Sequence, residues 1–203
     1  LNVPRAERER YDLRSLRKLL CSSAPAHVQQ KQGILEFFPG VALYEGYGST
    51  EAGIVTTLLP DEQMTKPGSI GRESSGTDGV RILGEDGHEV GVDEVGELYS
   101  RSAMMFDGYY KMPDVTARSF RGQHFSAGDM ARRDADGYYY LVDRKHNMVI
   151  TGGEHVFPSE VEKVIMTHPA VYDVAVIGVP DPKWTEAVKA VVILHEGAQA
   201  TAD

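Results

Sequence analysis

Four Asp-Gly dipeptides punctuate the middle of the chain, and they constrain its fold more than any other feature. They stand among short segments that alternate apolar and polar residues, at Asp78-Gly79, Asp86-Gly87, Asp107-Gly108 and Asp136-Gly137. Asp-Gly readily supplies the positive φ that tight turns need. Residues 66–143 are therefore predicted to form a β-rich subdomain of hairpins, in which the run Tyr138-Tyr139-Tyr140 packs as part of a strand.

The segment before this region has an α/β pattern. Residues 5–18 carry charges of both signs with leucines at helical spacing, which predicts a charged, solvated helix. A second helical pattern passes through Val28, Ile34, Leu35 and Phe38 and ends at Pro39-Gly40, and a strand with the sequence VALYEGYG follows. In such folds, ligands gather where strands end and loops begin.

The segment after residue 143 is predicted to be a small α+β unit. Residues 148–158 read as a hairpin turning on Gly152-Gly153. Ser159 and Glu162 are three residues apart, which is the spacing of a helix-capping box. One face of the predicted helix would carry Val161, Val164, Ile165 and His168. Residues 171–179 and 186–194 are two further apolar strands.

Composition excludes several classes of protein. The 203 residues, 41% hydrophobic and 25% charged, are typical of one or two globular domains. The formal charge of −9 argues against nucleic acid or an anionic membrane as the main partner. The single Cys21 cannot form an internal disulfide, no zinc-ligand spacing is present, and no apolar run approaches a membrane span. We therefore expect a cytoplasmic protein without a transmembrane segment, and the missing initiator Met suggests a piece of a longer chain.

Three stretches have the residue types of a nucleotide site. In residues 44–51 two glycines flank Tyr47, whose ring offers a stacking face, Thr50 can donate to a phosphate, and Glu51 can hold Mg²⁺. Asp129 follows a glycine turn and can accept two hydrogen bonds from a vicinal diol such as that of ribose. Two cations at Arg144 and Lys145 precede the Gly152-Gly153 turn. Taken singly, each stretch is explained equally well by ordinary structure: a strand-to-helix turn, a turn aspartate, and a charged linker before a plain hairpin.

Together and in this order, the stretches resemble the adenylate-forming superfamily of acyl-CoA synthetases, luciferases and peptide-synthetase adenylation domains. The resemblance rests on the blocks YGSTE, GELYSRSAMMFDGYY, SAGD and DRKHNMVITGGEHVFPSEVE, and it covers nearly the whole chain. It implies a mixed α/β and α+β fold. Residues 1–143 would be the end of the large AMP-binding N-terminal domain, with an α/β portion over 1–65 and the β-rich subdomain over 66–143. Residues 144–203 would be part of the small mobile C-terminal domain.

The resemblance also implies residue roles, with Thr50 and Glu51 as the catalytic pair. Gly46, Tyr47 and Gly48 would receive the adenine, Thr50 would contact the α-phosphate, and Glu51 would bind magnesium. The family's adenine-lining segment corresponds to Ser22, Ser23, Ala24 and Pro25, with Ser23 where glycine is usual. Asp129 and Arg144 would hold the ribose, and His146 stands at the hinge position, where Asp or Lys is usual. Gly152 and Gly153 would lie along the pantetheine arm of CoA, and Trp184 near its nucleotide; packing of Trp184 on the surface is an equal alternative.

The implied function is part of an ATP-dependent acyl-CoA synthetase, which joins a carboxylate to AMP, releases pyrophosphate and passes the acyl group to CoA. Ala52, Gly53, Ile54 and Val55 would border the acyl pocket and favour a fatty or aromatic acid. The family's phosphate loop and terminal catalytic lysine are not found in these 203 residues, so the chain alone is expected to be inactive. The alternatives are a peptide-synthetase adenylation domain, a noncatalytic nucleotide-binding module, and a structural domain.

Overall fold

A computed structural model of the chain describes residues 3–24 and 26–201. The chain divides into two compact units. One contains the residues up to Ala127 together with Ala131–Leu141, and the other contains Gly128–Met130 together with the residues from Val142 onward. Strands β9 and β10 carry residues of both units, and each unit is described here by itself.

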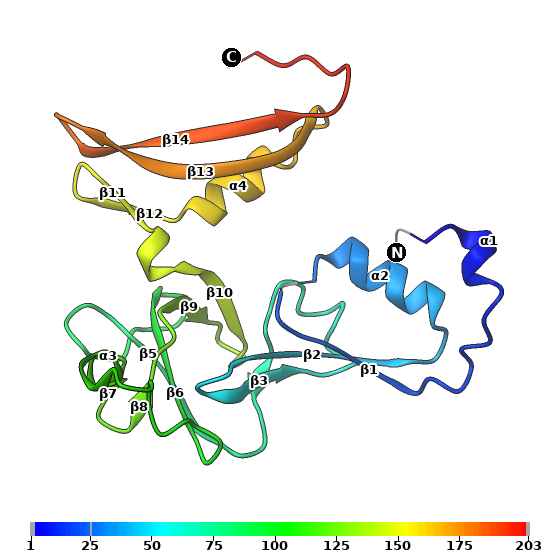
Figure 1. Cartoon of the computed structure of the whole chain (residues 1–203), viewed down its shortest axis with the longest axis horizontal. Coiled ribbons are helices and arrows are strands. Elements are labelled where there is room, and N and C mark those ends of the chain that lie inside the picture. Colours follow the sequence, from blue (N-terminus) through cyan, green and yellow to red (C-terminus); the bar gives the residue numbers. More distant parts are fainter. Residues whose placement is uncertain (1–2, 25, 202–203) are drawn as a thin grey trace. The chain divides into compact units, whose positions relative to one another are not determined.

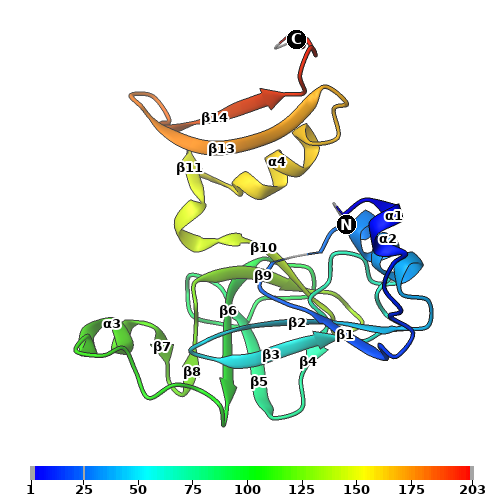
Figure 2. The ribbon, with the colours of Figure 1, turned by 45° about the vertical axis from the view of Figure 1, so that its right-hand side comes forward.

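The first unit begins with the α/β pattern that the sequence predicts. A four-stranded sheet has the order β1-β2-β3-β4, and β1 and β2 run parallel. Helix α2 makes the crossover between these two strands and lies over one face of the sheet (Figures 1 and 2). The elements are α1 (Arg5–Arg8), β1 (Lys18–Cys21), α2 (Val28–Phe37), β2 (Ala42–Ser49), β3 (Gly53–Leu58) and β4 (Arg72–Glu73).

The helix expected over residues 5–18 is wrong for most of its length, because only α1 forms. Asp12 turns the chain locally, since its Oδ1 accepts a hydrogen bond from the Arg14 amide at 3.1 Å. Leu13 and Leu16, the two leucines of the segment, are both exposed. Without a buried apolar face, mixed charges do not hold a short helix together.

The middle of the chain is β-rich, as predicted. A six-stranded sheet has the order β10-β9-β6-β8-β7, with β5 paired to β6. Its elements are β5 (Thr77–Leu83), β6 (Gly96–Ser102), α3 (Pro113–Arg118), β7 (Phe120–Arg121), β8 (His124–Phe125), β9 (Asp129–Arg133) and β10 (Tyr139–Arg144). Residues from β3, β5, β6, β8, β9 and β10 build one buried core that includes Val55, Ile82, Leu98, Phe125 and Tyr139.

The Asp-Gly pairs have positive φ at each glycine, but they are not all hairpin turns. Gly87 and Gly137 lie in connections between strands, at φ values of 80° and 84°. Gly79, with a φ of 94°, lies inside β5, where the pairing with β6 shifts register between Thr77 and Val80. This glycine therefore forms a bulge within a strand.

The second unit is a small α+β fold. Its four-stranded sheet has the order β12-β11-β14-β13, and β13 and β14 pair antiparallel over most of their length. The elements are η1 (Lys145–Asn147, a turn of 3-10 helix), β11 (Val149–Thr151), β12 (Glu154–Val156), α4 (Pro158–Ile165), β13 (Val171–Asp181) and β14 (Thr185–Leu194). The predicted hairpin is confirmed: β11 and β12 pair antiparallel across Gly152 and Gly153, which have φ values of 59° and 88°.

Helix α4 forms where expected, but the predicted capping box does not. The helix begins with Pro158 at its first position, which places Ser159 inside the first turn instead of at the cap. The Ser159 hydroxyl donates to the carbonyl of Val142, and Glu162 Oε1 accepts from the amide of Val176 at 2.8 Å. Both side chains therefore bind other elements of the unit, and they are unavailable to each other.

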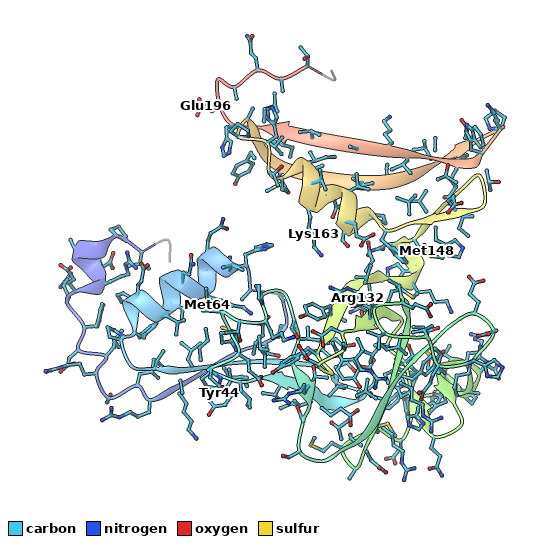
Figure 3. The ribbon with its side chains drawn as sticks, turned by 180° about the vertical axis from the view of Figure 1, so that it is seen from behind. Tyr44, Met64, Arg132, Met148, Lys163 and Glu196 are labelled. Carbon is cyan, nitrogen blue, oxygen red and sulfur yellow. The ribbon has the colours of Figure 1, made fainter. Side chains whose placement is uncertain are left out.

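The expected apolar face of α4 is also only partly realised, because Val164 is exposed. The side of α4 that faces away from β13 and β14 carries Lys163 (Figure 3).

Candidate functional site

The block from Tyr44 to Glu51 forms strand β2 and a tight turn into β3. This turn leads to a strand, so the strand-to-helix alternative is wrong. Gly48 stands opposite Ile54 in the ladder, and a Cβ on it would collide with the carbonyl of Gly53, so the hairpin can close only over glycine. Tyr47 is half-buried and packs partly against the core, which fixes the position of its ring.

Glu51 is attached to the loop that follows β6. The Tyr109 hydroxyl donates to Glu51 Oε1 at 2.9 Å, and the Phe106 amide donates to the Glu51 carbonyl at 2.8 Å. Burial, followed by the nearby Glu51 carboxylate, raises the pKa of Tyr109, so its phenol remains a donor through neutral pH. Thr50 is exposed at the tip of the same turn.

Tyr109 is a residue whose role the sequence did not reveal. It stands in the GELYSRSAMMFDGYY block, but nothing in that pattern indicates a contact with Glu51, which is 58 residues away. The contact depends on the path of the loop between β6 and α3.

The adenine-lining segment begins where β1 ends. Ser22 to Ala24 are exposed, and Pro25 lies outside the described residues. Ser23 has a φ of 75°, a left-handed conformation that favours glycine. The serine in a position where the family usually has glycine therefore keeps a backbone conformation suited to glycine. Gly46, on β2, is buried, and a Cβ on it would lie 3.4 Å from Cδ1 of Leu20 on β1.

Asp129 and Arg144 lie together in the second unit. Arg144 Nε donates to Asp129 Oδ1 at 2.7 Å, and the Asp129 carboxylate is mostly buried while Arg144 is half-exposed. Gly128 precedes the aspartate with a φ of 83°, and its carbonyl accepts from the Lys145 amide at 2.8 Å. The two residues expected at the ribose are thus joined by a direct ion pair, at the start of β9 and the end of β10.

The Gly152-Gly153 hairpin and Trp184 also lie together. The Gly152 amide donates to the Trp184 carbonyl at 2.9 Å, and a Cβ on Gly152 would lie 2.8 Å from Cε3 of the indole. The indole is nearly half-exposed, and the Lys183 ammonium lies 4.3 Å from its ring centroid. Both interpretations of Trp184 therefore keep support: one side of the ring packs on the hairpin, and part of the ring reaches solvent.

His146 lies in η1, between β10 and β11. It lines a polar cavity of about 380 Å³ with the acidic side chains Asp143, Glu162 and Glu186, all within the second unit. The structure therefore places the expected hinge residue in a short connection, on the wall of a cavity that it shares with three acidic residues.

The residues expected at the acyl pocket separate into two groups. Ala52 and Val55 are buried in the core, and that they border an acyl group stays a prediction. Ile54 is exposed and lines a cavity of about 840 Å³ that also involves Met104. Gly53 has a φ of 71°, and a Cβ on it would lie 2.9 Å from the Cβ of Met104. Along β3, Ile54 is exposed whereas the next two residues, Val55 and Thr56, are buried, so neighbouring residues of the predicted acyl pocket differ in exposure.

A magnesium ion fits this residue set only as part of a nucleotide complex. Among the described residues, no group of three or more His, Cys, Asp or Glu side chains could hold a metal. Mg²⁺ at nucleotide sites needs only one or two carboxylates, because phosphates and waters complete its coordination. Glu51, whose Oε1 is oriented by Tyr109, satisfies that requirement.

The fold and these motifs define a class of protein, and comparison with known proteins confirms it. The sequence profile of the AMP-binding enzyme family matches residues 1–110, and that of the AMP-binding enzyme C-terminal domain matches residues 160–203. The chain belongs to this family of adenylate-forming enzymes, and its mixed α/β fold with β-rich sheets agrees with that membership.

Two curated relatives have different acyl substrates in their names. A feruloyl-CoA synthase of an Amycolatopsis species is 41% identical over 95% of this chain and 39% of its own length. The medium/long-chain-fatty-acid–CoA ligase FadD8 of Mycobacterium tuberculosis is 43% identical over 87% of this chain and 31% of its own length. The chain thus spans between about a third and two fifths of the curated relatives it matches.

One similar solved structure holds ATP and magnesium, two of the three expected ligands. The o-succinylbenzoate–CoA synthetase of Bacillus subtilis, in complex with ATP and a magnesium ion, matches with a TM-score of 0.82 and 28% identity, over 96% of this chain and 40% of that one.

Within residues 3–24 and 26–201, no helix is long and apolar enough to cross a membrane.

Proposed function

We propose that this chain is the part of an ATP-dependent acyl-CoA synthetase that contains the adenine-binding, ribose-binding and hinge residues. The whole enzyme would condense a hydrophobic fatty or aromatic acid with ATP, release pyrophosphate and transfer the acyl group from AMP to CoA. The names of the two relatives, one for an aromatic acid and one for fatty acids, support this substrate class.

The observation that carries the proposal is the pairing of Asp129 with Arg144. Ordinary turn aspartates are exposed, whereas Asp129 is buried and held by an arginine 15 residues away. A buried carboxylate oriented by a cation can accept both hydroxyl protons of a ribose, because each of its oxygens has two acceptor positions. Half of Arg144 remains accessible to a ligand.

The first unit would supply the groups for adenine and phosphate. Tyr47 would stack on the adenine between Gly46 and Gly48, beside Ser23, Ala24 and Pro25. Thr50, exposed at the turn, would donate to the α-phosphate, and Glu51 would hold the magnesium ion. Magnesium bound there would supply charge neutralisation for the phosphates. Tyr109 would keep the Glu51 carboxylate in one orientation.

The second unit would supply the residues for the half-reaction that forms the thioester. His146 would serve as the hinge residue, and Gly152 and Gly153 would allow the pantetheine arm of CoA to lie against the backbone. Trp184 would offer its accessible ring to the CoA nucleotide. We also propose that the longer protein is cytoplasmic, since its cofactors ATP and CoA are abundant in the cytoplasm.

Nucleotide binding tests the first part of the proposal directly. Calorimetric titration of the 203-residue chain with AMP should show saturable binding, and Asp129→Asn should weaken it about tenfold, since one oxygen acceptor is lost. Asp173→Asn, an exposed aspartate on β13, is the matched control and should leave the dissociation constant unchanged. Equal affinity in Asp129→Asn and wild type would contradict the assignment of Asp129.

Turnover tests the second part. The chain would replace the corresponding segment of the Amycolatopsis feruloyl-CoA synthase, and pyrophosphate release would be measured with ferulate and with fatty acids of increasing length. We expect release that depends on the acid, followed by a thioester with free CoA. Nucleotide binding without pyrophosphate release for any acid would favour a noncatalytic nucleotide-binding module, and transfer to a carrier protein but not to CoA would favour a peptide-synthetase domain.

A further inference from the structure

Helix α2 contains a buried lysine. Lys31 has 1% of its surface exposed, although lysine is among the residue types least often buried. Its ammonium forms an ion pair with Glu45 on β2, which is itself 6% exposed. Within the described part of the chain, neither Lys31 Nζ nor Glu45 Oε2 has a hydrogen bond to any other group. Each charge is therefore balanced by the other.

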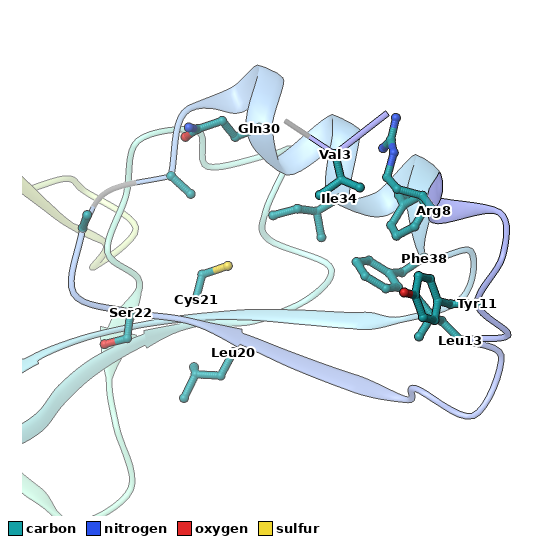
Figure 4. Close-up of a pocket in the computed structure, with 13 residues that line it drawn as sticks. Val3, Arg8, Tyr11, Leu13, Leu20, Cys21, Ser22, Gln30, Ile34 and Phe38 are labelled. Atoms are coloured by element: carbon teal, nitrogen blue, oxygen red, sulfur yellow. The ribbon is translucent and has the colours of Figure 1, made fainter. Parts of the chain in front are cut away.

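The geometry of the sheet explains how the two charges meet. Cys21 on β1 and Glu45 on β2 are partners in the parallel ladder, so their side chains point to the same face. Cys21 points toward α2, whereas Leu20 points to the opposite face (Figure 4). Glu45 therefore points toward α2 and meets Lys31 there, while the next residue, Gly46, belongs to the face of Leu20.

Glu45 also contacts the residue that follows the adenine-lining segment. Its Oε1 accepts a hydrogen bond from the amide of Ala26 at 3.3 Å, just beyond Ala24. The carboxylate thus joins three parts of the unit: α2 through Lys31, Ala26 through its amide, and β2 immediately before Gly46 and Tyr47. Cys21, the ladder partner of Glu45, and Ala26, its hydrogen-bond donor, line an open cavity of about 840 Å³ (Figure 4). Because Glu45 is only 6% exposed, its carboxylate keeps its place only while its cation is present.

We propose that Lys31 is a positioning residue for the adenine side of the nucleotide site. It holds the Glu45 carboxylate in the position from which that group fixes both Ala26, which follows the adenine-lining segment, and the β2 backbone that carries Gly46 and Tyr47. The inference rests on the proposed function, since it concerns where the adenine-binding groups are held.

The test compares Lys31→Met with the double variant Lys31→Met/Glu45→Gln. Methionine is similar in length to lysine but leaves the Glu45 charge without a cation. We therefore expect the dissociation constant for AMP to rise about tenfold. The double variant removes the stranded charge, while the amide oxygen of the new side chain at position 45 can still accept from Ala26. AMP affinity should therefore return to within about threefold of wild type. Gln32→Met, an exposed position on the same helix, is the matched control for introducing methionine and should bind AMP like wild type.

Hydrogen exchange of the Ala26 amide provides a readout that does not depend on nucleotide. It should accelerate in Lys31→Met, and it should be slow again in the double variant and in Gln32→Met. Wild-type AMP affinity together with wild-type Ala26 exchange in Lys31→Met would overturn the inference. A double variant no better than the single one would also overturn it, because Lys31 would then act by packing alone. If the wild-type chain binds no AMP, the proposed function fails, and the exchange of Ala26 still decides whether Lys31 holds Ala26 in place.

Discussion

At the scale of single residues, Ser23 shows a conflict between side chain and backbone. Its φ of 75° is easily adopted by glycine and costs an L-residue about 1 to 2 kcal/mol. Replacing it with glycine removes this strain but also makes the unfolded chain more flexible, which offsets part of the gain. We expect Ser23→Gly to raise the free energy of unfolding by about 0.5 to 1 kcal/mol, measured by urea denaturation.

The neighbouring Ser22 is the control for this substitution. It is exposed like Ser23, but its φ is not positive. Ser22→Gly should therefore leave stability unchanged or lower it, because only the flexibility of the unfolded chain changes. Similar effects of the two substitutions would show that strain at Ser23 contributes nothing to stability.

At the scale of elements, helices α2 and α4 show what a sequence pattern can and cannot predict. Lys31 stands three residues after Val28 and three before Ile34, so it occupies a position of the apolar stripe of α2. The pattern thus contains a signal for a buried lysine, but its partner Glu45 is 14 residues away and comes from the crossover geometry. Ser159 and Glu162 have the spacing of a capping box, yet contacts with Val142 and Val176 outcompete it.

Tyr139, on strand β10, leads to a prediction about how stability changes at alkaline pH. Burial, followed by the Glu73 carboxylate, raises the pKa of Tyr139 to about 12, against a value of 10 in the unfolded chain. As the pH rises, the unfolded chain releases this proton first. The Tyr139 contribution to the free energy of unfolding is therefore complete below about pH 10 and declines progressively up to about pH 12.

Tyr139→Phe should make the fall in stability above about pH 10 shallower, as measured by urea midpoints at a series of alkaline pH values. The slope does not vanish, because burial also raises the pKa of Tyr99. Tyr110→Phe is the control, since Tyr110 is 85% exposed and the slope should stay that of wild type. An unchanged slope in Tyr139→Phe would show that this phenol titrates equally in both states.

At the scale of the whole molecule, the motifs predicted the family and the main strands better than they predicted contacts. The β-rich middle, the Gly152-Gly153 hairpin and the family assignment are confirmed, because turn glycines and strand alternation are local properties of sequence. The Tyr109–Glu51 contact and the separation of Ala52 and Val55 from Ile54 depend on how distant strands pack. The roles proposed for the site residues therefore remain predictions for ligand binding to test.

The division into two units predicts that the chain unfolds in two separable steps. Trp184 is the single tryptophan and belongs to the second unit, so its fluorescence reports that unit, while far-UV circular dichroism reports both. Gly71 has a φ of 90°, and a Cβ on it would collide with the backbone of Thr57 in the first unit. In the second unit, Gly152 has a φ of 59° and lies against the Trp184 ring.

Each alanine substitution should therefore destabilise its own unit by about 1 to 3 kcal/mol, through strain at a positive φ and steric overlap. Gly71→Ala should move the circular dichroism transition to lower urea and leave the midpoint of Trp184 fluorescence in place. Gly152→Ala should move the fluorescence midpoint. Gly153→Ala separates the two causes in the hairpin: its φ is also positive, at 88°, but a Cβ there meets nothing within 4 Å, so its effect should be smaller. If both probes shift together in Gly71→Ala and in Gly152→Ala, the two units unfold as one cooperative body and the expectation of separate steps is wrong.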